Sequence, residues 1–343
     1  MIDKDVRNIA VGVVGCGYWG PKLIRNFQSI PGAHLQIIAD LRPDRLEHVQ
    51  GLYPMVQTTT SFEHLLETSI EAVALATPVR THYEMARQAL LCGKHVLVEK
   101  PLTCSAAEAE DLIALARSQN VRLMVGHTFV YNPAVEYLRD YIRRGDLGDV
   151  YYISATRVNL GIFQKDINVI WDLAPHDVSI LLFLLALEPT RVSTRGANYV
   201  QRGIEDVAFV TLYFPNGVMA DVRVSWLDPC KIRRITVVGS KKMIVYDDVE
   251  PNEKIRIYDK GVDKPPYSDT MEEFRLSYRQ GDITTPAIPG TEPLQIECES
   301  FLESIRTGAA SRSDGHAGLQ VVRILEAAQR SLANDGQAID IPG

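Results

Sequence analysis

The first third of the chain alternates short apolar runs with amphipathic stretches, and this alternation limits the possible fold more than any other feature. The apolar runs are continuous, as expected for strands covered on both faces, and they occupy residues 9–14, 35–39, 72–76, 95–98 and 122–125. Helical patterns fill the intervals, at residues 21–29, 43–52, 61–67, 80–92 and 105–120. Strict alternation predicts a doubly wound parallel sheet with right-handed crossovers. We expect this α/β domain at residues 1–126.

After residue 126 the pattern becomes β-rich, with the hairpin signal Asn216-Gly217 between two of the runs. The expected strands occupy residues 150–158, 191–199, 207–214, 218–226, 233–238 and 243–246, and the expected helices occupy 133–144, 175–187, 293–306 and 317–332. Residues 250–290 are polar and proline-rich and look like an extended loop. A chain of 343 residues fits two domains. We therefore expect residues 127–343 to form an α+β domain with a large open, mainly antiparallel sheet.

Charge and composition exclude several classes of function. The net charge is −7 and no basic run exceeds a residue pair, which disfavours nucleic-acid binding. The first eight residues lack the apolar core of a signal peptide, and the longest apolar stretch is far shorter than the roughly 20 residues of a membrane span. Five cysteines without metal-like spacing indicate reduced, buried thiols. We expect a cytoplasmic protein without a metal site, a membrane anchor or a nucleic-acid partner.

The motif Gly15-Cys16-Gly17-Tyr18-Trp19-Gly20 follows the first predicted strand and opens the first predicted helix. Glycines at this spacing permit a tight turn, close approach of the backbone to a pyrophosphate and close packing of helix on strand. The helix N-terminus adds free N–H groups and a partial positive charge. We therefore predict a dinucleotide site formed by Gly15, Gly17, Tyr18, Trp19 and Gly20.

Asp40 closes the second predicted strand, 20 residues after Gly20. A carboxylate there accepts hydrogen bonds from ribose hydroxyls and repels a 2′-phosphate, which favours NAD over NADP. Arg42 and Arg45 lie close enough in the sequence to weaken this preference. Asp40 could also cap the helix that follows Pro43.

Further candidates for cofactor contacts stand at the ends of later strands. Thr77 and Pro78 follow the predicted strand at residues 72–76, where the nicotinamide half of a dinucleotide would lie, and His82 follows in the next helix. The alternative for His82 is a surface or capping role. Glu99 and Lys100 follow the predicted strand at residues 95–98, and strand ends of an open α/β sheet are where ligands bind.

The candidate chemistry rests on Lys100, Asp172 and His176. Asp172 and His176 are four residues apart, so a helix places them one turn apart on one face. Hydride transfer from a secondary alcohol requires removal of the hydroxyl proton, and a histidine oriented by a carboxylate suits this task. Lys100 could hydrogen-bond the same oxygen and stabilise developing charge. The alternative makes Asp172 an N-cap and His176 a satisfied buried histidine.

Together these residues resemble the glucose–fructose oxidoreductase/inositol dehydrogenase/rhizopine catabolism family. The resemblance covers essentially the whole chain, and it rests on the glycine motif, Asp40, Ala76-Thr77-Pro78 with His82, Gly93-Lys94-His95 to Glu99-Lys100-Pro101, Gly145-Asp146-Leu147-Gly148 and Asp172 with His176. The resemblance implies a nicotinamide cofactor on the first domain and an open sheet that forms a homodimer or homotetramer. It matches Lys100 to the family's active-site lysine and the Asp172/His176 pair to that of the inositol dehydrogenases. The usual glycine-rich lead-in to that pair is absent, being replaced by Asn168-Val169-Ile170-Trp171.

By resemblance, the substrate is a sugar, and Thr128 stands where the family often contacts it. Asn159 and Asn168 could bond sugar hydroxyls, although a loop asparagine is more often a turn residue. The runs 171–177 and 225–227 look closest to enzymes that oxidise C3 of a UDP-linked N-acetylhexosamine or its uronic acid. The alternatives are an inositol or free-sugar dehydrogenase, and a non-catalytic dinucleotide-binding regulator. A regulator has no need of a proton-transfer set, which this chain retains.

Overall fold

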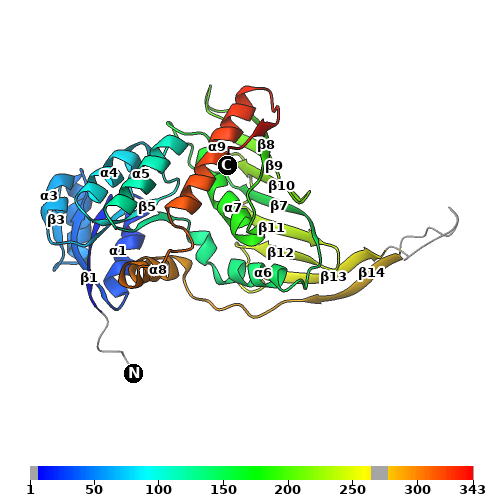
Figure 1. The fold of residues 1–343 in the computed structure, drawn as a ribbon, viewed down its shortest axis with the longest axis horizontal. Helices are drawn as coiled ribbons and strands as arrows, with labels where there is room; N and C mark the ends of the chain where they lie inside the picture. Colours follow the sequence, from blue (N-terminus) through cyan, green and yellow to red (C-terminus); the bar gives the residue numbers. More distant parts are fainter. Residues whose placement is uncertain (1–6, 264–276, 343) are drawn as a thin grey trace. The chain divides into compact units, whose positions relative to one another are not determined.

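The computed structural model describes residues 7–263 and 277–342 and divides the chain into two compact units (Figure 1). The first unit contains the chain up to Tyr131 and the segment Thr291–Arg323, and the second contains Asn132–Gly290 and Ile324–Gly343. The chain therefore returns to the first unit, whereas the predicted boundary placed all of residues 127–343 in the second domain. The reason is the apolar face of helix α8 (Pro293–Thr307), where Leu294, Cys298, Phe301 and Leu302 are buried. This face packs against α1 (Gly20–Ser29) and the short helix η2 (Thr128–Tyr131).

The first unit contains a six-stranded sheet in the order β3-β2-β1-β4-β5-β6, and every pairing in it is parallel. The strands are β1 (Ile9–Val14), β2 (Ala33–Ala39), β3 (Gln57–Thr59), β4 (Ala72–Leu75), β5 (His95–Glu99) and β6 (Leu123–Gly126). The strand order reverses between β1 and β4, which is the point where doubly wound sheets bind ligands. The doubly wound fold predicted from the sequence is confirmed; β3 was missed because three polar residues carry no apolar run.

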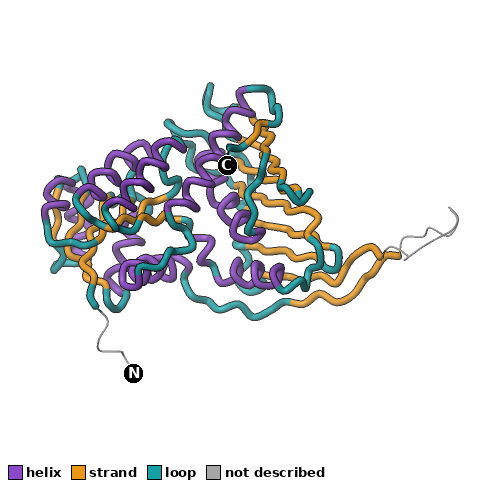
Figure 2. The backbone as a smooth tube through the Cα atoms, viewed as in Figure 1, coloured by secondary structure: helices purple, strands orange, loops and turns teal. Residues whose placement is uncertain are grey.

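Helices connect these strands, as the amphipathic stretches predicted (Figure 2). Beside α1, η2 and α8, the helical segments of the first unit are α2 (Pro43–Leu52), α3 (Phe62–Glu67), η1 (Val79–Thr81), α4 (His82–Leu91) and α5 (Ala106–Ser118). Ser105 caps α5 by accepting a hydrogen bond from the Glu108 N–H. Every β-strand that carries a predicted cofactor residue is thus followed by a helix or a short helical turn.

The second unit contains a nine-stranded sheet in the order β14-β13-β12-β11-β7-β10-β9-β8-β15. Its strands are β7 (Val150–Val158), β8 (Arg191–Ala197), β9 (Val207–Tyr213), β10 (Met219–Ser225), β11 (Ile232–Gly239), β12 (Met243–Asp247), β13 (Ile255–Asp263), β14 (Ser277–Thr284) and β15 (Ile339–Asp340). β7 and β10 pair in parallel and the other pairs are antiparallel. The predicted large, mainly antiparallel sheet is therefore confirmed.

One face of this sheet is covered by helices. Helix α7 (Val169–Leu185) packs on β7, β9 and β10, while α6 (Pro133–Arg143) packs on β12. Helix α9 (Gly315–Ala333) begins in the first unit and ends in the second, where the Ser331 hydroxyl accepts a hydrogen bond from the Thr194 N–H of β8. On the opposite face, side chains such as Phe209 and Met219 are exposed, in strict alternation with buried neighbours.

Several predicted elements need correction. Residues 250–290 are not an extended loop throughout, because β13 and β14 form an antiparallel pair there; residues 264–276 lie outside the described part of the chain. These strands were missed because lysine, aspartate and glycine interrupt their apolar pattern. Helix α7 begins at Val169 and contains Pro175 in its interior, so the expected start at residue 175 is wrong. In the described ranges 7–263 and 277–342, no helix is long and apolar enough to cross a membrane.

All five cysteines are free thiols, but only two of them are buried. Cys16 and Cys298 lie in the interior, whereas Cys92, Cys104 and Cys230 are exposed. The expectation that all five are buried is therefore wrong for three of them.

Candidate active site

The glycine motif forms the turn between β1 and α1, and its three glycines have different tasks. Gly15 has φ +94°, and a Cβ there would lie 2.5 Å from the Ala76 carbonyl oxygen. A Cβ on Gly20 would overlap the Gly15 carbonyl oxygen, whereas a Cβ on Gly17 would meet only Arg45 at 3.8 Å. Two glycines thus permit close packing of backbone on backbone, and the third leaves an open approach to the turn. This cradle fits the pyrophosphate of a dinucleotide, above the N–H groups that open α1.

Tyr18 and Trp19 flank the N-terminus of α1 and share a cation. The Lys22 Nζ atom lies 4.2 Å from the centre of the Tyr18 ring and 4.3 Å from that of Trp19. Tyr18 is exposed, whereas the Trp19 indole N–H is buried and has no hydrogen-bond partner among the described residues. The positive charge of Lys22 at this turn suits an anionic ligand.

The Asp40 carboxylate, 7% exposed, already ties three segments together. It accepts hydrogen bonds from the Cys16 N–H at 2.5 Å and the Arg42 N–H at 2.9 Å, and the Arg45 guanidinium lies 3.6 Å away. Arg42, not Asp40, occupies the N-cap position of α2, so the capping alternative is wrong. Burial, followed by the charge of Asp40, raises the pKa of the Cys16 thiol to about 12, which leaves this cysteine unreactive.

His82 joins the ends of two neighbouring strands. Its Nδ1 atom lies 2.8 Å from the Pro101 carbonyl oxygen and its Nε2 atom 2.9 Å from the Thr77 carbonyl oxygen. Burial lowers the pKa of His82, although both carbonyl contacts act in the opposite direction. Because both ring nitrogens face backbone carbonyls, His82 holds the turns after β4 and β5 in place. The predicted contact with a cofactor gains no support from these hydrogen bonds.

Glu99 ends β5 and Lys100 follows it directly, and both residues are half-buried. Burial raises the pKa of Glu99 to about 7, although the charge of Lys100 acts in the opposite direction. The Glu99 carboxyl group accepts a hydrogen bond from the Lys100 N–H at 3.3 Å and lies beside Gly126, where a Cβ would be 3.0 Å from the carboxyl carbon. Glu99 therefore occupies the space that Gly126 leaves free at the end of β6.

Two buried titratable residues of this region were missed by the sequence analysis. His127 follows β6, and burial, followed by the charge of Lys100, lowers its pKa to about 3. Glu297 lies on α8 with no exposed surface, next to the predicted substrate residue Thr128, which begins η2. His127 carried a sequence signal, since it follows a strand end directly; Glu297 carried none, because it lies about 170 residues later in an ordinary amphipathic helix.

In the second unit, Asp172 and His176 lie one turn apart on α7. The Asp172 carboxylate accepts a hydrogen bond of 2.9 Å from the indole N–H of Trp226, which follows β10 and is 1% exposed. The ring of Phe163 packs edge-on against Trp226 at 5.7 Å. Asp172 is therefore held by a rigid aromatic side chain and does not act as the N-cap of α7.

The N-cap of α7 is Asn168, whose side chain is fully engaged. Its oxygen accepts a hydrogen bond from the Trp171 N–H, and its two amide hydrogens are donated to Glu205 and Gln329, each at 2.8 Å. The predicted contact of Asn168 with a sugar therefore gains no support from these hydrogen bonds. Asn159 follows β7 with a half-buried side chain, beside Gly161.

A buried ion pair fixes the rotation of α7 against the sheet. The Arg157 guanidinium of β7 binds the Asp177 carboxylate through two hydrogen bonds of 2.7 and 3.1 Å, with side chains 5% and 2% exposed. Asp177 directly follows His176 in the helix. The pair therefore determines which face of α7 carries Asp172 and His176.

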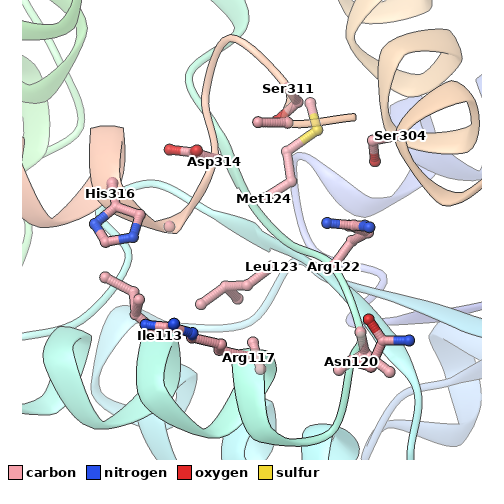
Figure 3. Close-up of a pocket in the computed structure, with 14 residues that line it drawn as sticks. Ile113, Arg117, Asn120, Arg122, Leu123, Met124, Ser304, Ser311, Asp314 and His316 are labelled. Carbon is pink, nitrogen blue, oxygen red and sulfur yellow. The ribbon is translucent and has the colours of Figure 1, made fainter. Parts of the chain in front are cut away.

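The clearest cavity of the first unit lies away from the glycine motif. It has a volume of about 260 Å³ and lies where α5 ends, β6 begins and α8 connects to α9 (Figure 3). Arg117, Arg122, Asp314 and His316 contribute its charged and titratable lining. None of the predicted site residues lines it. The described residues also contain no cluster of side chains able to hold a metal ion.

Comparisons with known proteins agree with this geometry. The family model described as oxidoreductase family, NAD-binding Rossmann fold, matches residues 9–127, and the model of the GFO/IDH/MocA C-terminal domain matches residues 135–245. A UDP-N-acetylglucosamine 3-dehydrogenase from Acidithiobacillus ferrooxidans is 28% identical over 92% of this chain and 94% of its own length. An inositol 2-dehydrogenase from Rhizobium meliloti is 26% identical over 96% of this chain and 98% of its own.

Solved structures give the same result for the fold. A structure of UDP-N-acetylglucosamine 3-dehydrogenase from Acidithiobacillus ferrooxidans superposes with a TM-score of 0.78 at 26% identity, covering 96% of this chain and 99% of that one. A putative oxidoreductase from Magnetospirillum magnetotacticum superposes with a TM-score of 0.78 at 30% identity, covering 93% and 99%.

Proposed function

Because the chain belongs to the GFO/IDH/MocA family and is an NAD-binding oxidoreductase, we propose that it oxidises a secondary hydroxyl group of a nucleotide sugar. The proposed target is C3 of a UDP-linked N-acetylhexosamine or of its uronic acid. The similarity to a UDP-N-acetylglucosamine 3-dehydrogenase over nearly the whole chain supports this substrate class.

NAD would occupy the cradle of the glycine motif, and the nicotinamide would supply the hydride acceptor. The proposed contacts come from Gly15, Gly17, Tyr18, Trp19 and Gly20 around the pyrophosphate, Asp40 at the ribose, and Thr77, Pro78, Glu99 and Lys100 toward the nicotinamide. Asp40 can accept bonds from ribose hydroxyls only with the lone pairs that Cys16 and Arg42 leave available. Arg45 keeps the charge of Asp40 partly compensated.

The proposed chemistry needs one proton acceptor and one oxygen-stabilising donor. His176 takes the hydroxyl proton as the hydride leaves the carbon, and Asp172 orients the imidazole. Lys100 donates a hydrogen bond to the same substrate oxygen. The observation that carries this assignment is the anchored carboxylate of Asp172, which Trp226 holds one turn before His176. Thr128 and Asn159 are the proposed sugar contacts.

The second candidate is an inositol or free-sugar dehydrogenase with the same Lys100, Asp172 and His176. It is favoured by the similarity to an inositol 2-dehydrogenase over almost the whole chain. A non-catalytic dinucleotide-binding regulator has less support, because it would have no use for this set of residues. The protein is proposed to act in the cytoplasm.

The exposed face of the second sheet is the proposed contact between copies of the chain. Tyr152, Phe209 and Met219 are exposed there, and large apolar side chains in one place mark interaction surfaces. We expect a homodimer or homotetramer in light scattering after size exclusion, and Phe209→Glu should shift it toward the monomer. A wild-type protein that is monomeric at micromolar concentration would contradict this proposal.

A substrate screen distinguishes the candidate functions. Purified protein with NAD is mixed with UDP-N-acetylglucosamine, its uronic acid, myo-inositol or glucose, and NADH absorbance and melting temperature are recorded. NADH formation with a UDP-sugar alone supports the first candidate, and a response to inositol or glucose alone supports the second. Tight NAD binding without turnover of any sugar would favour the regulator.

A further inference from the structure

The first unit contains a cluster of buried polar groups, of which the proposed function uses only Trp19. Among its described residues, the buried side-chain atoms without a hydrogen-bond partner belong to three residues: the indole nitrogen of Trp19, both ring nitrogens of His127 and both carboxyl oxygens of Glu297. Unpaired polar atoms in a protein interior are costly and rare. Their gathering in one place therefore indicates a shared cause.

Trp19 and Glu297 both interact with Glu99, and His127 is next in the chain to a residue that lies against it. The side chain of Trp19, at the N-terminus of α1, lowers the pKa of the Glu99 carboxyl group. His127 follows Gly126, which lies against that carboxyl group. Glu297 lies on α8, and the charge of Glu99 raises the pKa of its carboxyl group. Four separate segments of the chain thus meet around one carboxylate, which stands next to Lys100.

Glu297 is poorly suited to carry a charge of its own. It has no exposed surface, and burial, followed by the charge of Glu99, raises its pKa well above the ordinary value. The nearby Thr128 hydroxyl lowers the pKa of Glu297, but it does not have the geometry of a hydrogen bond to the carboxyl group. As a neutral acid, Glu297 would gain an O–H donor, and an isolated buried carboxylate would be avoided.

The charged groups around Glu99 and Glu297 indicate which of the two carboxyl groups needs the O–H donor. The charges of Lys22 on α1 and of Lys100, directly after β5, lower the pKa of Glu99. No cation of the described residues has such an effect on Glu297. The remaining titratable neighbours of Glu297 are Tyr131 from η2 and Cys298 on its own helix, and both are buried and neutral. Of the two carboxyl groups, Glu99 is therefore the one placed to carry the negative charge.

We propose that Glu297 is a positioning residue for Glu99 and, through it, for Lys100. It remains a neutral carboxylic acid and donates its proton in a hydrogen bond toward the Glu99 carboxylate, directly or through one buried water. Glu99 then stays ionised beside Lys100, so the ammonium group keeps its counterion while it donates to the substrate oxygen. This inference rests on the proposed role of Lys100.

The first experiment tests whether Glu297 is neutral, without reference to activity. Melting temperatures of the wild type and Glu297→Gln are measured from pH 4 to 8. Unfolding lets Glu297 ionise above its ordinary pKa of 4.5, so the wild type should lose stability relative to the variant as the pH rises. The difference in melting temperature between the two proteins should widen steadily as the pH rises. A gap that stays constant with pH would overturn the proposal.

Glu303→Gln is the matched control, because Glu303 lies on the same helix with an exposed side chain near Arg306. Its melting temperature should follow that of the wild type at every pH. A gap that widens equally for both variants would mean that helix charge, and not burial of Glu297, causes the effect, and would also overturn the proposal.

The second experiment compares Glu297→Gln, which keeps a donor, with Glu297→Met, which does not. NAD⁺ affinity, NADH affinity and sugar turnover are measured against pH. The Met variant should move the ionisation of Glu99 upward by about one to two pH units, as expected for one lost hydrogen bond to a charged group. The Gln variant should keep the wild-type profile. Identical profiles for all three proteins, or a Gln variant that shifts like Met, would overturn the proposal.

The two proposals fail in different ways. If no sugar is turned over, the melting and NAD⁺-binding profiles still decide the role of Glu297. If turnover depends on Lys100 while the pH profiles of the Gln and Met variants coincide, the inference about Glu297 is overturned and the proposed function stands.

Discussion

At the scale of single residues, the proposed mechanism assigns the proton transfer and the binding of the dinucleotide to different side chains. Lys100 and His176 are proposed to act on the hydroxyl group, whereas the glycine motif and Asp40 are proposed to hold the dinucleotide. The two groups of residues should therefore affect different kinetic constants.

We expect Lys100→Ala and His176→Ala each to reduce turnover by about 10²- to 10⁴-fold, which is the usual contribution of a positioned proton-transfer group. The affinity for NAD should change much less. Stopped-flow measurement of hydride transfer and titration with NAD check the two quantities. A variant that loses NAD affinity as strongly as turnover would have to be removed from the catalytic role.

Asp40→Ala should relax the selectivity for NAD over NADP, because a carboxylate that repels a 2′-phosphate is removed. The ion pair of Arg45 with Asp40 also breaks, which frees a guanidinium for that phosphate. The measurement is the ratio of the Kd values of the two dinucleotides, with Glu47→Ala as the control, because Glu47 is an exposed carboxylate on the neighbouring helix α2. An unchanged ratio would mean that the ribose is recognised elsewhere.

At the scale of secondary-structure elements, the position of α7 relative to its sheet controls the proposed catalytic pair. Asp177→Ala should lower the free energy of unfolding by about 3–5 kcal/mol, because the buried Arg157 would lose the carboxylate that binds it through two hydrogen bonds. Denaturant titration measures this loss. The exposed pair of Arg144 and Asp146 provides the control, and Asp146→Ala should cost less than about 1 kcal/mol. Equal losses would contradict the structural role given to the buried pair.

The elements also show what the sequence could predict. The continuous apolar runs of β1, β2, β4, β5 and β6 predicted the parallel sheet, because such runs have few other solutions. The pair β13 and β14 was missed because polar residues and glycines interrupt its apolar pattern, although Ile255 and Ile257 of β13 are buried. The start of α7 was missed because Pro175 resembles a helix start, although Asn168 caps the helix two turns earlier.

The candidate site was only partly accessible to sequence reasoning for a related reason. Local motifs predicted residues such as Gly15 and Lys100, whose roles follow from neighbouring residues. Trp226 and Glu297 act through contacts with residues 54 and about 200 positions away, and no local pattern contains such information.

At the scale of the whole molecule, buried histidines should make stability depend on acid. His127 has a pKa of about 3 when folded, against 6.5 for the ordinary side chain. Above pH 6.5 its neutral form contributes fully to stability, and this contribution is lost as the pH falls toward 3, because the unfolded chain then binds the proton more readily.

We therefore expect His127→Gln to weaken the fall of melting temperature between pH 6.5 and 4. His64→Gln, at an exposed position, is the control and should follow the wild type. Parallel curves for all three proteins would mean that His127 binds a proton as readily in the folded as in the unfolded state, and would contradict the lowered pKa.

The most direct test of the central claim follows the transferred hydrogen itself. UDP-N-acetylglucosamine that carries deuterium at C3 is incubated with the protein and NAD⁺, and the recovered NADH is analysed by mass spectrometry. The account predicts NADH with one deuterium on the nicotinamide ring, formed by the wild type and not by Lys100→Ala in the same time. Unlabelled NADH would place the oxidised carbon elsewhere, and NADH formation that is unaffected in Lys100→Ala would contradict the proposed mechanism.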